Sequence, residues 1–164
     1  MRNNKTSYLT QSAAVAAVYV LLTMLAAAMG LSSGQIQVRF SEALTILPCF
    51  LPAAVPGLFI GCLLSNILSG GVIWDVVFGS LATLLGAVGT RLLRKNRWLA
   101  CLPPILANTV IVPFVLVYAY GVPEGIPYLM LTVGVGEVIS CGILGMLLRS
   151  VLQKYRKYIF DVQK

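Results

Sequence analysis

The chain has 164 residues, of which 59% are hydrophobic and only 10% charged, and its net charge is +7. A soluble domain of this size would carry charge on roughly a quarter of its residues, so the composition excludes a water-soluble domain and predicts an all-α integral membrane protein. The basic residues lie at the ends of apolar segments, not among exposed aromatic side chains, which argues against a nucleic-acid-binding protein.

The first apolar segment covers residues 8–30 and runs about 20 residues without a charge, long enough for a transmembrane helix. It is too long for the core of a signal peptide. Its first half contains alanines four residues apart, among them Ala13 and Ala17. Small residues at this spacing let helices approach closely, so this smooth face could dock a partner.

A polar stretch, GQIQVRFSE (34–42), follows the first segment. We expect it to fold over the mouth of a binding site, with Gln35 and Gln37 on the folded segment. Glu42 is the expected ligand group and Arg39 its orienting partner. The alternative is that Arg39 and Glu42 form a surface ion pair, or that Arg39 reaches the outer headgroups.

The second apolar segment, residues 42–69, contains Pro48, Pro52 and Pro56. Each proline removes a hydrogen bond from a helix interior, which favours two short helices over one long one. The expected helices of a single domain (1–164) are therefore 8–30, 42–52, 56–69, 74–93, 98–119 and 126–152.

The distribution of basic residues supports six transmembrane helices. With six spans, both termini and the 91–97 loop lie on the same side of the membrane, together with every lysine and arginine except Arg39. Basic residues concentrate on the cytoplasmic side of membrane proteins. The sequence therefore predicts that both termini are cytoplasmic, and that the short middle helices line a cavity open to the outside.

The polar residues that fall within or beside these spans are the candidate ligand-binding residues. Glu137 is ten residues after Pro127, or about 15 Å into the last helix, near midmembrane. A carboxylate there costs ~2.5–3.5 kcal/mol and no basic residue is expected at that depth, which points to a function. Gly134 and Gly136 beside it are expected to leave room for a ligand. The full candidate set is Glu137, Asn108 at the same depth, Asn66 in the outer half, and Arg39, Gln37, Glu42, Trp74 and Asp75 near the mouth.

Several of these residues have a structural alternative. Asp75 could be the N-cap of a helix. Trp74 could be an aromatic residue of the membrane interface. Asn66 and Asn108 could form hydrogen bonds between helices.

Catalytic and metal-binding signatures are missing from the sequence. It contains no histidine, and Cys49, Cys62, Cys101 and Cys141 are too far apart for a CxxC motif. We therefore expect no metal, no cofactor and no enzymatic activity. The alternatives that stay open at this point are a membrane-embedded enzyme, and a channel or structural membrane adaptor.

Three segments together resemble a known family: GQIQVRFSEALTILPCFLPAAVPGLFIGCLLSNIL (34–68), WDVVFGSLATLLGA (74–87) and VGVGEVISCGILG (133–145). They are similar to the QueT family of queuosine-precursor transporters. The six predicted helices and the early alanine motif also resemble the substrate-binding S components of energy-coupling factor (ECF) transporters. The resemblance covers nearly the whole chain.

The resemblance implies uptake, across a bacterial plasma membrane, of a 7-deazaguanine base such as the pre-queuosine base or queuine. It also implies a transmembrane T component, contacted through Ala13 and Ala17, and two ATPase subunits. The sequence itself has no G-x-x-x-x-G-K-[ST] motif for binding ATP. An S component for another vitamin-like small molecule is the alternative. A deazaguanine edge offers two N–H donors that the carboxylate of Glu137 could accept.

Overall fold

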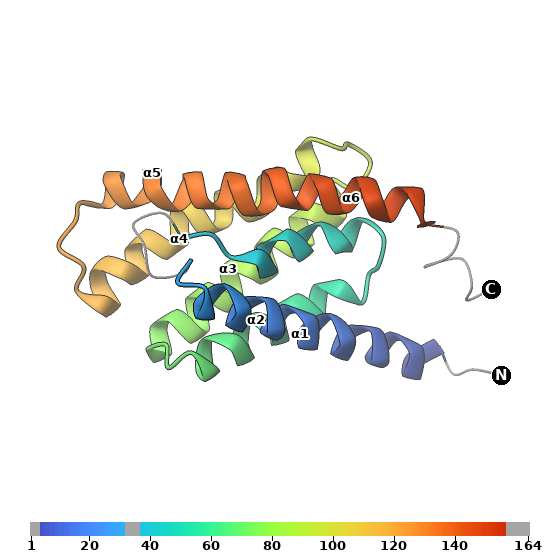
Figure 1. The fold of residues 1–164 in the computed structure, drawn as a ribbon, viewed down its shortest axis with the longest axis horizontal. Helices are drawn as coiled ribbons and strands as arrows, with labels where there is room; N and C mark the ends of the chain where they lie inside the picture. The colour runs from blue at the N-terminus through green and yellow to red at the C-terminus, as the bar shows by residue number, and fades with distance from the viewer. Residues whose placement is uncertain (1–3, 32–36, 157–164) are drawn as a thin grey trace.

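The structure is a computed structural model that describes residues 4–31 and 37–156. These residues form helices and connections, and no strand occurs among them. The order along the chain can be followed in Figure 1. The elements are α1 (Asn4–Ala28), the 3₁₀ helix η1 (Phe40–Cys49), α2 (Ala54–Leu68), α3 (Ile73–Leu92), the short 3₁₀ helix η2 (Leu99–Cys101), α4 (Leu102–Tyr120), α5 (Ile126–Glu137), the π-helical segment η3 (Val138–Leu144) and α6 (Gly145–Lys154).

These elements combine into the six helical rods that the sequence predicts, because η2 continues into α4, and η3 joins α5 to α6. The prolines explain why the second apolar segment is divided. Pro48 lies inside η1, which is a 3₁₀ helix, and Pro52 lies in the turn before α2. Pro56 falls in the first turn of α2, where backbone N–H groups have no partner within the helix, so it costs little.

Four of the described rods are long and apolar enough to cross a membrane: Lys5–Ala28, Ile73–Leu92, Leu99–Tyr120 and Ile126–Lys154. η1 and α2 are apolar but only 10 and 15 residues long. A perpendicular helix needs ~20 residues to span the hydrocarbon core. The crossing of the membrane by these two shorter helices therefore remains a prediction.

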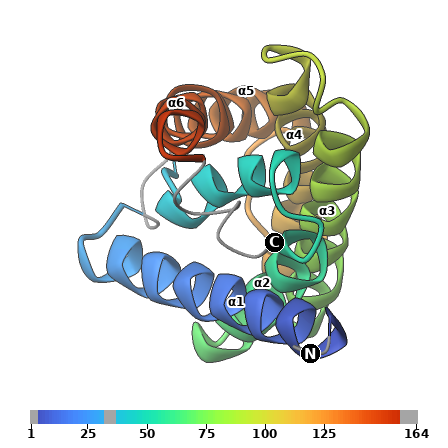
Figure 2. The same ribbon diagram turned by 90° about the vertical axis from the view of Figure 1, so that its right-hand side faces the viewer.

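η1 occupies the middle of the bundle, between α1, α3 and the α5–α6 rod (Figure 2). Its buried residues include Glu42, Leu44, Thr45 and Ile46. α1 packs closely against α2 because Gly57 and Gly61 face its backbone; a Cβ at Gly57 would lie 2.6 Å from the carbonyl oxygen of Ser12. This close packing brings the polar side chains of α1 to the centre of the protein.

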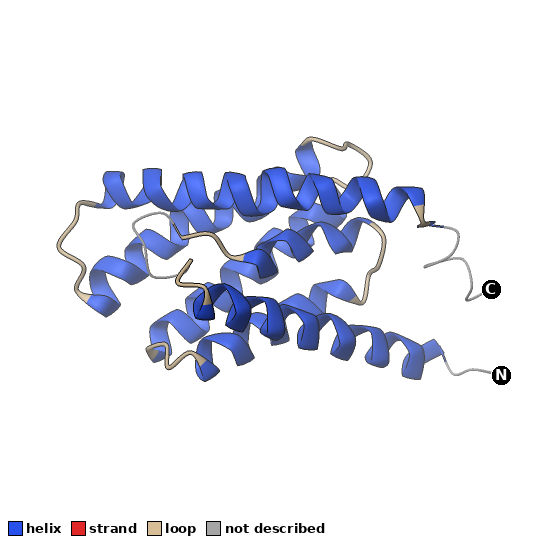
Figure 3. Cartoon of the chain, viewed as in Figure 1, coloured by secondary structure: helices blue, strands red, loops and turns tan. Residues whose placement is uncertain are grey.

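Both described ends of the chain lie at the same end of the molecule (Figure 3). The Tyr8 hydroxyl donates to the carbonyl of Pro52, which places the start of α1 beside the turn between η1 and α2. Arg149 of α6 donates to the carbonyl oxygens of Arg94 and Arg97, at 3.3 and 3.5 Å. We call this the basic end; its described basic residues are Lys5, Arg91, Arg94, Lys95, Arg97, Arg149, Lys154 and Arg156.

The opposite end carries the α2–α3 turn (69–72) and the connection between α4 and α5 (121–125), with Asp75 and Glu124. This separation of charges agrees with the arrangement that the sequence predicts. Arg2, Lys157 and Lys164, which also belong to that prediction, lie outside the described residues. The assignment of the basic end to the cytoplasm remains a prediction.

Candidate ligand-binding site

A cavity of about 440 Å³ opens near the end opposite the basic end. Its walls come from the ends of four helices and from the extended segment that precedes η1. The lining residues are Thr23, Ala26 and Ala27 of α1, Gln37 and Arg39, Asn66, Ser69, Gly70 and Gly71 after α2, Asp75 of α3, and Leu116, Tyr120 and Val122 at the end of α4.

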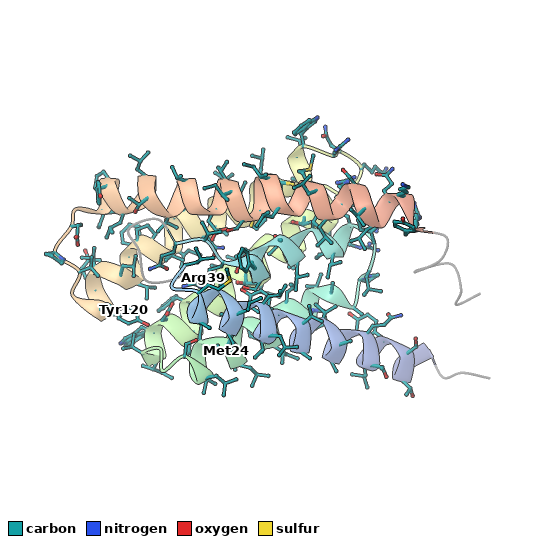
Figure 4. All side chains as sticks on the ribbon, viewed as in Figure 1. Met24, Arg39 and Tyr120 are labelled. Atoms are coloured by element: carbon teal, nitrogen blue, oxygen red, sulfur yellow. The ribbon has the colours of Figure 1, made fainter. Side chains whose placement is uncertain are left out.

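Arg39 lies in the interior, between α1 and the α5–α6 rod (Figure 4). Its backbone is extended and its N–H donates to the Ser140 hydroxyl at 3.2 Å. Next to it, the carbonyl oxygen of Gln37 lies against Gly136, at a position that a Cβ would overlap. The absence of a side chain at Gly136 therefore allows residues 37–39 to run directly against α5.

Asp75, Asn66 and Tyr120 form the outer wall of the cavity. The Tyr120 hydroxyl donates to Asp75 Oδ2 at 2.9 Å, and Tyr120 is visible at the cavity end in Figure 4. The buried Asn66 amide donates to the backbone carbonyl of Asp75 at 3.3 Å. Asp75 lies in the first turn of α3, but the N-cap is Val72, so the interpretation of Asp75 as an N-cap is wrong.

A second, much smaller cavity of about 20 Å³ lies deeper in the bundle. Glu137 and Asn108 line it together, as expected from their equal depth. Gln37 and Arg39 line both this cavity and the larger one. The expectation that no basic residue lies near Glu137 is therefore wrong, because the Arg39 side chain reaches inward from the extended segment.

Behind this small cavity, Glu42 and Glu137 lie close together. Ligand atoms of Glu42, Glu137 and Cys141 are all within 4.8 Å of one another. Glu42 accepts hydrogen bonds from the Tyr19 hydroxyl and, at 3.5 Å, from the Asn108 amide. The Cys141 thiol donates to Glu137 Oε2 at 3.2 Å. Because both oxygens of Glu42 have donors, we assign no metal to this group.

Two positions differ from the sequence-based expectation. Glu42 is not at the mouth of the site: only 1% of it is exposed, because η1 lies in the middle of the bundle. Trp74 is 59% exposed and does not line the polar cavity. It lines instead an apolar groove of about 500 Å³ on α3 and α4, with Phe78 stacked beside it at 6.0 Å between ring centroids.

The two glycines of α5 also have a different role. A Cβ at Gly134 would lie 3.5 Å from the Thr109 side chain, and Gly136 makes room for Gln37. The expectation that they leave space for a ligand is therefore wrong, since each faces another part of the protein.

Sequence reasoning missed Tyr19, Thr23 and Tyr120. Tyr19 and Thr23 are four residues apart on α1 and lie on the same face as the buried Ser12. Polar residues that share one face of an apolar helix would have been a usable signal. Tyr120 carries no such signal, because a tyrosine at a helix end is also typical of a membrane interface.

Ala13 and Ala17 are exposed on α1, on a different face from Ser12 and Ala16, which pack on α2. The residues expected to contact a partner are thus available on the surface of this chain. Their contact with a T component remains a prediction.

Comparisons with known proteins agree with these features. The profile of the QueT transporter family matches residues 9–154. Over 86 residues the chain is 41% identical to a protein of Lactococcus lactis subsp. cremoris (strain MG1363) named queuosine precursor transporter QueT. That match covers 52% of this chain and 50% of the relative, about half the relative's length. No solved structure matches the chain. Since the family profile covers most of the chain, this protein belongs to the QueT transporter family.

Proposed function

We propose that this protein is the substrate-binding S component of an ECF-type importer for a queuosine precursor. The substrate is a 7-deazaguanine base such as the pre-queuosine base or queuine. Membership of the QueT transporter family supports transport, and the name of the Lactococcus relative supports the substrate class. The polar cavity is the observation that carries the proposal, because it offers this chain a place to bind a small molecule.

The cavity has suitable size and polarity. Its volume of about 440 Å³ falls within the range of ~300–1,000 Å³ typical of small-molecule sites. It lies at the end opposite the basic end, which would face outward if the basic end is cytoplasmic. An importer needs its binding site on the outer side, so the position of the cavity favours uptake.

The deep residues suit the polar edge of a deazaguanine. Glu137 has one oxygen engaged by Cys141, and it can still accept the N–H and amino donors of the base. The Asn108 amide lies beside it in the same small cavity, with Glu42 behind the amide as a positioning group. Arg39 supplies a donor for the carbonyl oxygen of the base. Tyr120, which lines the larger cavity, offers an aromatic ring on which the flat base can stack.

Residues 37–39 form the side of the cavity where a lid would act. Gln37 and Arg39 separate the large cavity from the small one, since they line both. A shift of the Arg39 side chain would join the two spaces and admit the base to Glu137. We therefore retain Gln37 and Arg39 as ligand contacts and as the movable part of the site.

The proposed partners are a transmembrane T component and two ATPase subunits in the bacterial cell membrane. The exposed Ala13–Ala17 face supports the first contact, because small residues four apart let another helix approach closely. The sequence has no ATP-binding motif of its own, so an ATP-driven importer built on this chain would need its ATPase on other subunits.

The test is calorimetry on purified Glu137→Gln with a 7-deazaguanine base. Glutamine keeps the volume but places an N–H donor opposite a donor of the ligand. Mispaired buried polar groups cost ~1–3 kcal/mol, and more where a charge is involved, so we expect affinity to fall about tenfold or more. Glu124→Gln is the matched control, because Glu124 is exposed and lines neither cavity.

Wild-type affinity in a folded Glu137→Gln protein would remove Glu137 from the site. Failure of the wild-type protein to bind any 7-deazaguanine would contradict the proposed substrate class. In that case, mass spectrometry of the molecule released on denaturation would reveal a different vitamin-like ligand.

A further inference from the structure

We propose that four arginines at the basic end bind the headgroup of an anionic phospholipid. We call them the arginine cluster: Arg91 near the end of α3, Arg94 and Arg97 in the connection that follows, and Arg149 of α6. The cluster shares no residue with either cavity, so this lipid site does not depend on the identity of the transported molecule.

Hydrogen bonds tie α6 to the connection between α3 and η2. The Arg149 guanidinium donates to the carbonyl oxygens of Arg94 at 3.3 Å and Arg97 at 3.5 Å. In the other direction, the Arg97 side chain donates to the hydroxyl of Ser150 on α6 at 3.0 Å. These contacts place three guanidinium groups of the cluster on neighbouring pieces of the chain.

The end of η1 brings the fourth arginine to the same place. Arg91 donates to the carbonyl oxygen of Pro48 at 2.9 Å, and Arg149 donates to Sγ of the next residue, Cys49, at 3.6 Å. Two arginines that are far apart in the sequence therefore reach the same turn of η1. The cluster is a fixed arrangement of cations from three parts of the chain.

The positive charges of the cluster are not neutralised by the described residues. The acceptors just named are carbonyls, a hydroxyl and a sulfur atom, and Nε of Arg149 is buried without a hydrogen-bond partner. The described carboxylates lie elsewhere, Glu42 and Glu137 in the bundle and Asp75 and Glu124 at the opposite end. Such a concentration of cations attracts anions, and guanidinium groups match phosphate oxygens especially well.

Exposed apolar side chains beside the cluster indicate that the anion belongs to a lipid. Leu92 is 77% exposed and Trp98 is 73% exposed, and the Arg97 guanidinium lies over the Trp98 ring at 5.7 Å from its centroid. Two rods that are long and apolar enough to cross a membrane, Ile73–Leu92 and Leu99–Tyr120, meet here. Tryptophan is enriched at the level of the headgroups, and basic residues at this level attract anionic lipids. A phospholipid thus meets arginines with its phosphate and apolar side chains with its acyl chains.

The experiment titrates the purified full chain in detergent with phosphatidylglycerol or phosphatidylcholine of the same acyl chains, and counts bound lipids by native mass spectrometry. Both lipids contain a phosphate, but only phosphatidylglycerol has a net negative charge. One basic residue near an anionic lipid surface contributes about fivefold in binding, so the wild-type protein should prefer phosphatidylglycerol by about tenfold or more. The double variant Arg94→Gln/Arg97→Gln should reduce this preference at least about fivefold. It keeps the backbone carbonyls that accept from Arg149.

Lys5→Gln/Lys154→Gln is the matched control, because it removes two exposed cations from the same end but outside the cluster, and it should keep the preference. Equal affinity of the wild-type protein for the two lipids, or an equal loss of preference in both double variants, would overturn the site.

A competition with inorganic phosphate separates a lipid from a small anion. Phosphate at the concentration of the lipid should not displace phosphatidylglycerol, because it makes no apolar contacts. Displacement would overturn the lipid as the occupant. If Arg94→Gln/Arg97→Gln does not fold, the comparison of the two lipids on the wild-type protein and this competition decide. The transported ligand is absent from all of these measurements, so the proposed function stands or falls separately.

Discussion

At the centre of the bundle, the Tyr19 hydroxyl donates a hydrogen bond to the Glu42 carboxylate, and both side chains are almost wholly buried. Tyr19→Phe removes this donor and leaves the carboxylate with the 3.5 Å contact to Asn108. An unsatisfied buried acceptor costs ~1–3 kcal/mol, more when it is charged. We expect a clear drop in the melting temperature of the ligand-free protein.

Tyr118→Phe is the matched control, because Tyr118 is 78% exposed and the same hydroxyl is lost from the surface. Its melting temperature should stay within error of the wild type. If Tyr19→Phe melts like Tyr118→Phe, the buried pair does not contribute to stability, and Glu42 is held by its other neighbours.

For single residues, the sequence could predict how deep in the membrane a residue inside a long helix lies. Glu137 and Asn108 were placed correctly beside each other because 1.5 Å of rise per residue converts sequence position into depth. Glu42 could not be placed, since its burial depends on η1 lying inside the bundle. Trp74 could not be assigned either, because an aromatic residue at a helix end fits a binding site and a membrane interface equally well.

The packing of one secondary-structure element on another can be tested at the contact between residues 37–39 and α5. In Gly136→Ala the new methyl group would overlap the carbonyl oxygen of Gln37, so the extended segment must move. Overpacking of this kind costs ~1–3 kcal/mol. Because Gln37 and Arg39 line both cavities, ligand affinity measured by calorimetry should fall together with the melting temperature.

Gly142→Ala tests whether this effect belongs to the contact itself. A Cβ at Gly142 would lie 3.7 Å from its nearest neighbour, a side-chain atom of Val138, which is an ordinary contact. This variant should bind ligand like the wild type. Equal losses in Gly136→Ala and Gly142→Ala would mean that the whole rod, not the extended segment, resists the added methyl group.

The exposed face of α1 gives a second prediction at this scale. Ala13→Trp and Ala17→Trp add bulk at exposed positions that line neither cavity, so the purified variants should bind ligand normally. If a partner helix packs there, the same variants should abolish uptake in cells that express the full complex. Leu25→Trp, at an exposed position further along α1, is the control and should keep uptake.

A loss of binding equal to the loss of uptake would show that Ala13 and Ala17 belong to the packing of this chain.

The helices themselves were predictable because apolar length and proline position are local signals. The exposed alanine face was predictable as a smooth surface, but the sequence does not state which side of α1 meets α2. That depends on Gly57 and Gly61, which accept Ser12 and Ala16.

For the whole molecule, the prediction concerns orientation in the membrane. Lys95 lies at the basic end and Glu124 at the opposite end. A membrane-impermeant thiol reagent applied to intact cells should label Glu124→Cys, and should label Lys95→Cys only after the membrane is opened. Labelling of both from one side would contradict the six-span topology.

The four native cysteines are free, and Cys62, Cys101 and Cys141 are buried while Cys49 is half-buried. The parent protein therefore serves as the background measurement.

The separation of charge was visible in the sequence because insertion depends on lysine and arginine near the ends of helices. The cavity was not, since its walls come from four helix ends and one extended segment that only the fold brings together.

The π-helical segment η3 affects how the residues at the two ends of the α5–α6 rod are rotated relative to each other about the rod axis. A regular α-helix turns by about 100° per residue, and a π-helical stretch fits more residues into each turn. Glu137 lies immediately before η3, and Arg149 lies beyond it, bonded to the carbonyls of Arg94 and Arg97. Seven π-helical residues turn the rod about as far as six α-helical residues, so removing one residue from η3 would let the rod become regular and leave Arg149 facing those carbonyls. A residue removed from an α-helical part of the rod would instead turn Arg149 by about 100° relative to Glu137, and the alignment of the binding cavity with the basic end would be lost.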